Sequence, residues 1–198
     1  TTGAIDNGSS DACGISLSLD QYNFTCSNVG DNTLTLTVSD PNGNSSTCTA
    51  NVLVRDLVAP VAICQDIMVE LNVDGEHVTT PGAVNNGSSD ACGIETYELS
   101  QTFFDCDDIN TNNVVTLTVT DVNGNSNSCT ATITVRDNVA PVAICQNVQV
   151  YLDETGFGFT TEQLVNNGST DACGLLPQCP PSAPNVGCLS GLALSKKN

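Results

Sequence analysis

Positive charge is scarce in this sequence. Its 198 residues contain 4 Lys+Arg against 22 Asp+Glu, which gives a formal net charge of -18. Nucleic acids and anionic membrane surfaces attract proteins through a basic face, which Arg55, Arg136, Lys196 and Lys197 are too few to build. We therefore expect no nucleic-acid partner, and we expect cations, Ca²⁺ first, to be the natural counterpart of this chain.

Aromatic residues and long apolar runs are scarce as well. Only 4% of the residues are aromatic and there is no Trp, so a stacking platform for sugars has little support and any core must be small and aliphatic. No apolar run approaches the roughly 18 to 20 residues that span a bilayer, so we expect no membrane insertion. The chain starts without Met and without a charged-then-apolar leader, and we expect a processed product or a segment of a longer chain.

The groups that usually carry catalysis or bind zinc are few. His77 is the only histidine, and no two cysteines have the Cys-x-x-Cys spacing of a zinc site. Asp107 and Asp108 are adjacent, but neighbouring residues of a strand or loop tend to point apart. We therefore expect this chain not to be an enzyme.

Cysteine, by contrast, is abundant. Eleven cysteines in 198 residues favour an oxidising compartment, extracellular or at the cell surface, where disulfides persist. A disulfide that closes a short loop contributes about 3 kcal/mol, which is comparable with the whole stability expected of a small unit.

The chain is built from a repeat. The block Ala4–Ile15 returns as Ala83–Ile94 and again as Leu164–Leu175, and the block Leu34–Cys64 returns as Val115–Cys145. Both blocks share one period of 79 to 81 residues, so chance is not a serious alternative.

Apolar residues alternate with period two along several runs, which is typical of half-buried β-strands. The runs are 34–38, 50–54, 67–73, 115–119 and 131–135. Asn42-Gly43 and Asn123-Gly124 separate pairs of these runs, where a tight turn needs positive φ. The predicted fold class is all-β, with tandem disulfide-stapled β-sandwiches, because about 80 residues per unit suit a seven-strand sandwich.

Proline marks where the repeats join, because it prevents the simple continuation of a strand at Arg55-Asp56 to Pro60 and at Arg136-Asp137 to Pro141. The predicted domains are a partial repeat at 1–57 that lacks its first strand, a complete repeat at 58–138, a partial third repeat at 139–175, and an irregular Pro- and Cys-containing tail at 176–198.

Three motifs resemble a known family. They are the Asn-Gly-Ser-Ser-Asp-Ala-Cys-Gly block, the Thr-Val-Thr-Asp-x-Asn-Gly-Asn-Ser…Cys hairpin and the Val-Ala-Pro-Val-Ala-x-Cys linker. Together they resemble the hyalin-type repeat, an immunoglobulin-like module, and more closely the HYR-like tandem repeats of long secreted and cell-surface proteins of Bacteroidota. This resemblance covers about residues 1–175 and implies extracellular architecture, often adhesive or gliding-related, without catalysis.

Each repeat has four cysteines, which allow three connectivities, so the sequence does not force one choice. In the complete repeat we predict Cys92–Cys106, which closes a short loop. We also predict Cys64–Cys129, which can form only if the first and last strands pair or face each other. The equivalents of the short-loop pair are Cys13–Cys26 and, by similar spacing, Cys173–Cys188.

Two further cysteines lack partners in complementary ways. The partner of Cys48 would lie on a first strand before Thr1, and the last-strand partner of Cys145 is missing. One hypothesis is that residues 139–163 of one chain complete the unit begun by residues 1–57 of the next, with Cys48 bonded to Cys145. Such a head-to-tail contact gives a fibre. The alternative is that the chain is cut from a longer one, whose neighbouring repeats supply the partners.

Candidate calcium ligands recur at equivalent positions. They are Asp11, Asp90 and Asp171 in the loop block, Asp40 and Asp121 before the Asn-Gly turns, and Asp56 and Asp137 at the linkers. Calcium takes six to eight oxygen ligands, which Asp-rich loops with Asn, Ser and backbone carbonyls can supply. The alternative is that these side chains only accept hydrogen bonds from the backbone of turns.

These patterns predict a non-catalytic extracellular segment, structural or adhesive, that forms a stalk or filament and has Ca²⁺ as its cofactor. Its partners would be like subunits or neighbouring repeats, with a surface or glycan receptor as a further candidate. The alternative is an accessory module of a secreted hydrolase, whose catalytic domain would lie outside this sequence.

Overall fold

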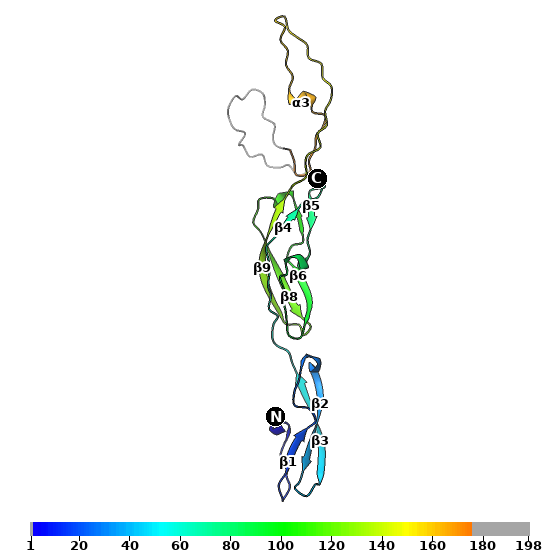
Figure 1. Ribbon diagram of the computed structural model, residues 1–198, viewed down its shortest axis with the longest axis vertical. Helices are drawn as coiled ribbons and strands as arrows, with labels where there is room; N and C mark the ends of the chain where they lie inside the picture. Colours follow the sequence, from blue (N-terminus) through cyan, green and yellow to red (C-terminus); the bar gives the residue numbers. More distant parts are fainter. Residues whose placement is uncertain (1, 176–198) are drawn as a thin grey trace. The chain divides into compact units, whose positions relative to one another are not determined.

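The computed structural model describes residues 2–175, and their regular structure is mostly β (Figure 1). The predicted tail at 176–198, with Cys188, lies outside these residues. The helical segments are about one turn long: α1 (Thr2–Ile5), α2 (Pro81–Val84), α3 (Glu162–Val165) and the 3₁₀ turns η1 (Cys26–Asn28) and η2 (Cys106–Asp108). No described helix is long and apolar enough to cross a membrane. The predicted all-β fold class is confirmed.

The first repeat contributes a three-stranded antiparallel sheet. Its order is β1 (Ser16–Leu19), β2 (Gly30–Ser39) and β3 (Ser45–Val54). Ser39 pairs with Ser45 at the hairpin turn, and Gly43 in that turn has a φ of 90°. This positive φ is what the Asn-Gly pair predicted, because glycine adopts it without steric strain.

The predicted complete repeat contains two sheets. The four-stranded sheet has the order β4 (Ile67–Glu70), β9 (Ser126–Arg136), β8 (Asn113–Asp121) and β6 (Ile94–Leu99). The two-stranded sheet consists of β5 (Glu76–Val78) and β7 (Phe103–Asp105). β4 pairs in parallel with β9, so the first strand of the repeat lies beside its last strand.

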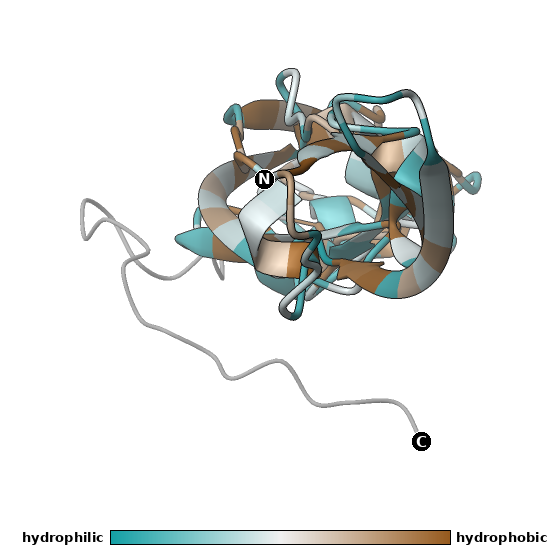
Figure 2. Cartoon of the chain, turned by 90° about the horizontal axis from the view of Figure 1, so that it is seen from below, coloured by the Kyte–Doolittle hydropathy of each residue, from teal (hydrophilic) through white to brown (hydrophobic). Residues whose placement is uncertain are grey.

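Alternate residues of these strands form the core. The side chains that are 0 to 5% exposed include Val69 of β4, Phe104 of β7, Val115, Leu117 and Val119 of β8, and Ala131, Ile133 and Val135 of β9. Apolar and polar bands alternate along the strand ribbons in Figure 2. The period-two pattern of the sequence therefore corresponds to inward-facing residues, in a disulfide-stapled immunoglobulin-like β-sandwich.

Contacts between residues group the chain into two units. Among the described residues, one unit comprises 2–65, 81–100 and 116–131, and the other comprises 66–80, 101–115 and 132–175. β8 and β9 each contribute residues to both units. The repeat boundaries read from the sequence are not the boundaries of this grouping and stay a prediction.

The third repeat retains its loop pairing but has no strand element among its described residues. Val142 bridges Thr170 and Cys145 bridges Asn166, as Val61 bridges Ser89 in the second repeat. Residues 148–151 are equivalent to β4 in the repeat, yet the described chain offers them no strand like β9 to pair with. An isolated strand is not stable in water, which explains its absence here.

Candidate functional site

Three disulfides join six of the described cysteines. They are Cys26–Cys92, Cys64–Cys129 and Cys106–Cys173, with sequence separations of 66, 65 and 67 residues. Two of the three therefore connect one repeat with the next, at equivalent positions of the repeat. In each of these two, a cysteine of a 3₁₀ turn bonds the cysteine of the following loop block, which we define as residues 86–93 or 167–174.

The structure has the predicted Cys64–Cys129 disulfide. Cys64 lies just before β4 and Cys129 lies in β9, and these two strands pair in parallel. The bond therefore staples the first strand of the repeat to its last strand, as the sequence argument required.

The predicted short-loop disulfides are wrong. Cys26 does not bond Cys13, Cys92 does not bond Cys106, and Cys173 bonds Cys106 in place of Cys188. The reason lies in the pairing of segments that are far apart in the sequence. The loop block at 86–93 pairs with the linker through which the chain enters the repeat, whereas η2 is followed by Ile109, which bridges Val135 near the end of β9.

Gly75 makes room for the disulfide at η2. A Cβ atom at this position would lie 2.8 Å from Cys106 Sγ, 3.1 Å from Ala172 Cβ and 3.6 Å from Cys173 Sγ. The φ of Gly75 is 76°, so a side chain is disfavoured by both the backbone and the space. This glycine lets the β4–β5 turn contact the loop block of the next repeat directly.

Three described cysteines have free thiols: Cys13, Cys48 and Cys145, all of them exposed. The first is the loop-block cysteine of the first repeat. The predicted bond between Cys48 and Cys145 was between chains, so this single chain leaves it a prediction.

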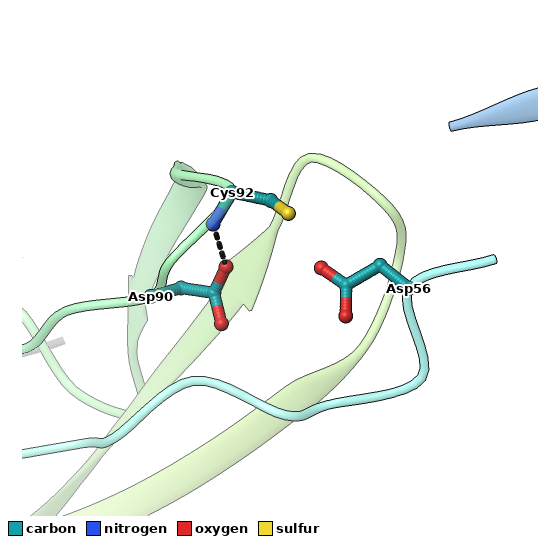
Figure 3. Close-up of side chains that lie close together, drawn as sticks. All are labelled: Asp56, Asp90 and Cys92. Atoms are coloured by element: carbon teal, nitrogen blue, oxygen red, sulfur yellow. Dashed lines mark hydrogen bonds between the residues drawn. The ribbon is translucent and has the colours of Figure 1, made fainter. Parts of the chain in front are cut away.

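Beside each inter-repeat disulfide lies an acidic cluster. The first cluster is Asp56, Asp90 and Cys92, shown in Figure 3, and the second is Asp137, Asp171 and Cys173. Within each cluster one oxygen or sulfur atom per residue lies within 4.8 Å of the others, and all six residues are half-buried. The sequence proposed the linker aspartates and the loop-block aspartates separately, and the structure brings them together in pairs.

Backbone hydrogen bonds hold these carboxylates in place. Asp90 Oδ1 accepts from the N–H of Cys92 at 2.7 Å, and Asp56 Oδ1 accepts from the N–H of Val58 at 3.0 Å. The second cluster repeats both bonds, from Cys173 to Asp171 at 2.9 Å and from Val139 to Asp137 at 2.9 Å. Only Oδ1 is used in each case among the described residues, so Oδ2 of each carboxylate is available to a ligand.

The donor set of the clusters suits a hard cation. The sulfur atoms of Cys92 and Cys173 are in disulfides, so they offer no thiolate to a soft metal such as zinc. Two carboxylates fit Ca²⁺, although the six to eight oxygens of a full shell would need backbone carbonyls and water as well. Asp11 is exposed and belongs to neither cluster.

Asp40 and Asp121 are engaged by the hairpin turns. Oδ1 of Asp121 accepts from the N–H groups of Asn123 and Asn125, and its Oδ2 accepts from Asn125 Nδ2. Burial acts to raise the pKa of Asp121, but these hydrogen bonds outweigh it and the pKa is lowered. The side-chain and backbone hydrogen bonds from Asn44 likewise lower the pKa of Asp40. Both aspartates therefore accept hydrogen bonds within the turns, which is the alternative to calcium binding that the sequence left open.

Sequence reasoning missed Asn123 as a possible ligand. Its Oδ1 atom is buried and has no hydrogen-bond partner among the described residues. The side chain lines a surface hollow together with Asp56, Arg55 and Leu57. The Asn-Gly pattern indicated only a turn here, and no sequence signal distinguishes Asn123 from Asn42.

Comparisons with known proteins identify no family. No protein-family model matches the chain, and no curated protein matches it. A solved structure of mouse clustered PcdhgC3 EC1-3 aligns with 57% of this chain and 45% of its own, at 20% identity and a TM-score of 0.29. This chain thus spans less than half of that protein's chain, and a TM-score this low supports no conclusion about function.

Proposed function

We propose that this chain is a non-catalytic extracellular structural segment, part of a stalk or filament with an adhesive or spacer role, as the hyalin-type resemblance implies. The observation that carries the proposal is the pair of equivalent disulfides, Cys26–Cys92 and Cys106–Cys173. Three disulfides also indicate an oxidising, extracytoplasmic compartment.

These two disulfides give the chain a short covalent route. From Cys26 the route crosses to Cys92, follows the backbone to Cys106 and crosses again to Cys173. At about 3.5 Å per extended residue, and with 5.1 Å between the Cα atoms of each disulfide, this route is about 60 Å long, whereas the reduced chain between the same ends reaches about 500 Å. A pulling force therefore acts on covalent bonds before it can extend the small cores, which suits a tether under load.

Single-molecule stretching between residues 1 and 198 tests this function. The oxidised chain should gain about 450 Å less contour length on unfolding than the reduced chain. Cys26→Ser removes the Cys26–Cys92 disulfide and so interrupts the short route. The shortest covalent path that remains uses Cys64–Cys129, and it increases the extended length of the chain by about 160 Å. Cys64→Ser is the matched control, because its disulfide lies off the route and its loss adds no length. Equal extension of the oxidised and reduced chains contradicts the proposal.

We also propose that Ca²⁺ binds the two acidic clusters and stiffens the junctions. In its support, each cluster presents two uncoordinated Oδ2 atoms beside a disulfide, and the first has the orphaned Asn123 Oδ1 in the hollow that Asp56 lines. The formal charge of -18 adds a general attraction for cations.

A further inference from the structure

The two inter-repeat disulfides leave one segment of the chain unspanned. Cys26–Cys92 and Cys106–Cys173 each close a loop of the chain. Neither loop includes residues 93–105, which we call the edge segment. The short covalent route runs through the backbone of the edge segment, so one cut there would separate the two loops if no other disulfide were present.

The edge segment is open to a protease. It consists of β6, the connecting loop and β7, and among the described strands β6 pairs only with β8 and β7 only with β5. Residues 95–98 and 100–103 are exposed. A free strand edge can pair with an extended segment of another protein, such as the wall of a protease cleft. Tyr97 and Phe103, which are 36% and 45% exposed, offer the aromatic side chains that an apolar specificity pocket accepts.

The third disulfide spans the edge segment. Cys64–Cys129 closes a loop that includes the edge segment completely and overlaps each of the other two loops. After any single cut between residues 26 and 173, at least one disulfide therefore joins the two sides. Hydrolysis of a peptide bond consumes one water molecule and leaves the disulfides unchanged, so this connection needs no redox step.

We propose that Cys64–Cys129 is a second covalent connection, which keeps the chain continuous when an extracellular protease cuts the edge segment. This gives a role to the one disulfide that the short covalent route does not use. The proposal rests on the proposed function, because it needs the same two inter-repeat disulfides, and it adds resistance to proteolysis.

The number of cuts that separate Cys26 from Cys173 follows from this overlap. One cut must fall in the edge segment. Two more must isolate the Cys64–Cys129 pair, and they fall on both sides of Cys64 within the first loop or on both sides of Cys129 within the last. The minimum is therefore one plus two, which is three cuts. Without Cys64–Cys129, one cut in the edge segment is enough.

A tryptic site placed in the edge segment tests the proposal. The parent chain has Arg55, Arg136, Lys196 and Lys197 as its only Lys and Arg residues. Gln101→Arg adds one site, in the exposed loop between β6 and β7. The oxidised chain is alkylated at its free thiols and digested in dilute urea, which opens every site to trypsin. Cuts after positions 55, 101 and 136 should leave one species near 20.5 kDa on a non-reducing gel, and four fragments after reduction.

Cys64→Ser/Cys129→Ser removes the third disulfide without leaving a new thiol. Combined with Gln101→Arg, this double substitution should divide the digested chain into two species on the non-reducing gel, separated at position 101. The double substitution without Gln101→Arg is the matched control. It should stay one species, because the two inter-repeat disulfides span the cuts after Arg55 and Arg136.

The digests distinguish failure of this proposal from failure of the proposed function. Division of the oxidised Gln101→Arg chain at position 101, with the parent chain still one species, would overturn the proposal and leave the tether standing. One undivided species from the triple variant, with the cut at position 101 seen after reduction, would overturn it as well, because another connection would then span the edge segment. Release of residues 1–55 from the parent chain would contradict both, because Cys26–Cys92 would then be absent.

Discussion

The aspartates of this repeat have two distinct roles. Asp40 and Asp121 direct both carboxylate oxygens into the hairpin turns that follow them. Asp56 and Asp90 use one oxygen each for the backbone and leave the other free. The sequence could identify all of these positions by their recurrence, but it could not assign the roles, because both uses need the same residue type next to a turn.

Asp121→Asn should lower the melting temperature by several degrees at neutral pH, because the new Nδ2 group would face Asn125 Nδ2, donor against donor. The pKa of Asp121 is lowered in the folded state, so its stabilising effect is present above the unfolded pKa of about 3.9 and is lost as the pH falls through the folded pKa. Thermal melts from pH 7 down to pH 2 should therefore show the two chains converging in acid. Asp107→Asn, at an exposed position, is the control and should melt like the parent chain. A pH-independent gap would contradict this role of Asp121.

Asp90→Asn tests the acidic clusters. The substitution keeps the Oδ1 atom that accepts from Cys92 N–H and replaces the free oxygen with an N–H₂ group, so the loop should keep its fold while losing an anionic ligand. The number of Ca²⁺ ions bound per chain, measured by calorimetric titration at millimolar Ca²⁺, should fall from about two to about one, because the cluster of Asp137 and Asp171 remains. Asp74→Asn, exposed and outside both clusters, should retain both sites. Absence of heat in the parent chain, or equal loss in both variants, would exclude calcium there.

Each run that the sequence predicted as a strand has at least one pairing partner in the structure. β8 alternates buried Val115, Leu117 and Val119 with threonine, as the period-two pattern predicted. Residues 148–151 have similar composition to β4 but form no strand, because strand formation depends on a neighbour that no local pattern encodes. Local sequence therefore predicted which residues can form strands, and pairing decides which ones do.

Phe104→Ala should destabilise the complete repeat by about 3 to 5 kcal/mol, because this side chain of β7 is 0% exposed and no other aromatic fills its place. In a domain of about 80 residues, that loss corresponds to a decrease in melting temperature of at least about 12 °C. Phe103→Ala, the next residue on the same strand and 45% exposed, should cost less than about 1 kcal/mol. Urea unfolding of both variants with the disulfides intact measures the difference, and similar losses would place the core elsewhere.

For the whole molecule, the disulfide connectivity was the part that the sequence could not determine. Repetition shows that Cys26 and Cys106 are equivalent, and that Cys92 and Cys173 are equivalent. It does not show whether a 3₁₀-turn cysteine bonds the loop block of its own repeat or that of the next. Chain entropy alone favours neither strongly, since closing a loop of 66 residues stabilises by about 4 kcal/mol and a short loop by about 3. The choice depends on which ends of the repeat meet, and this is a property of the fold.

Mapping the disulfides of the oxidised monomer tests the central claim most directly. Digestion under non-reducing conditions, followed by mass spectrometry, should yield linked peptides for Cys26–Cys92, Cys64–Cys129 and Cys106–Cys173. That result would establish that a disulfide links each of these repeats to the next, as the proposed tether under force requires. Linked peptides for Cys13–Cys26 and Cys92–Cys106 would contradict it, because each repeat would then be stapled only to itself.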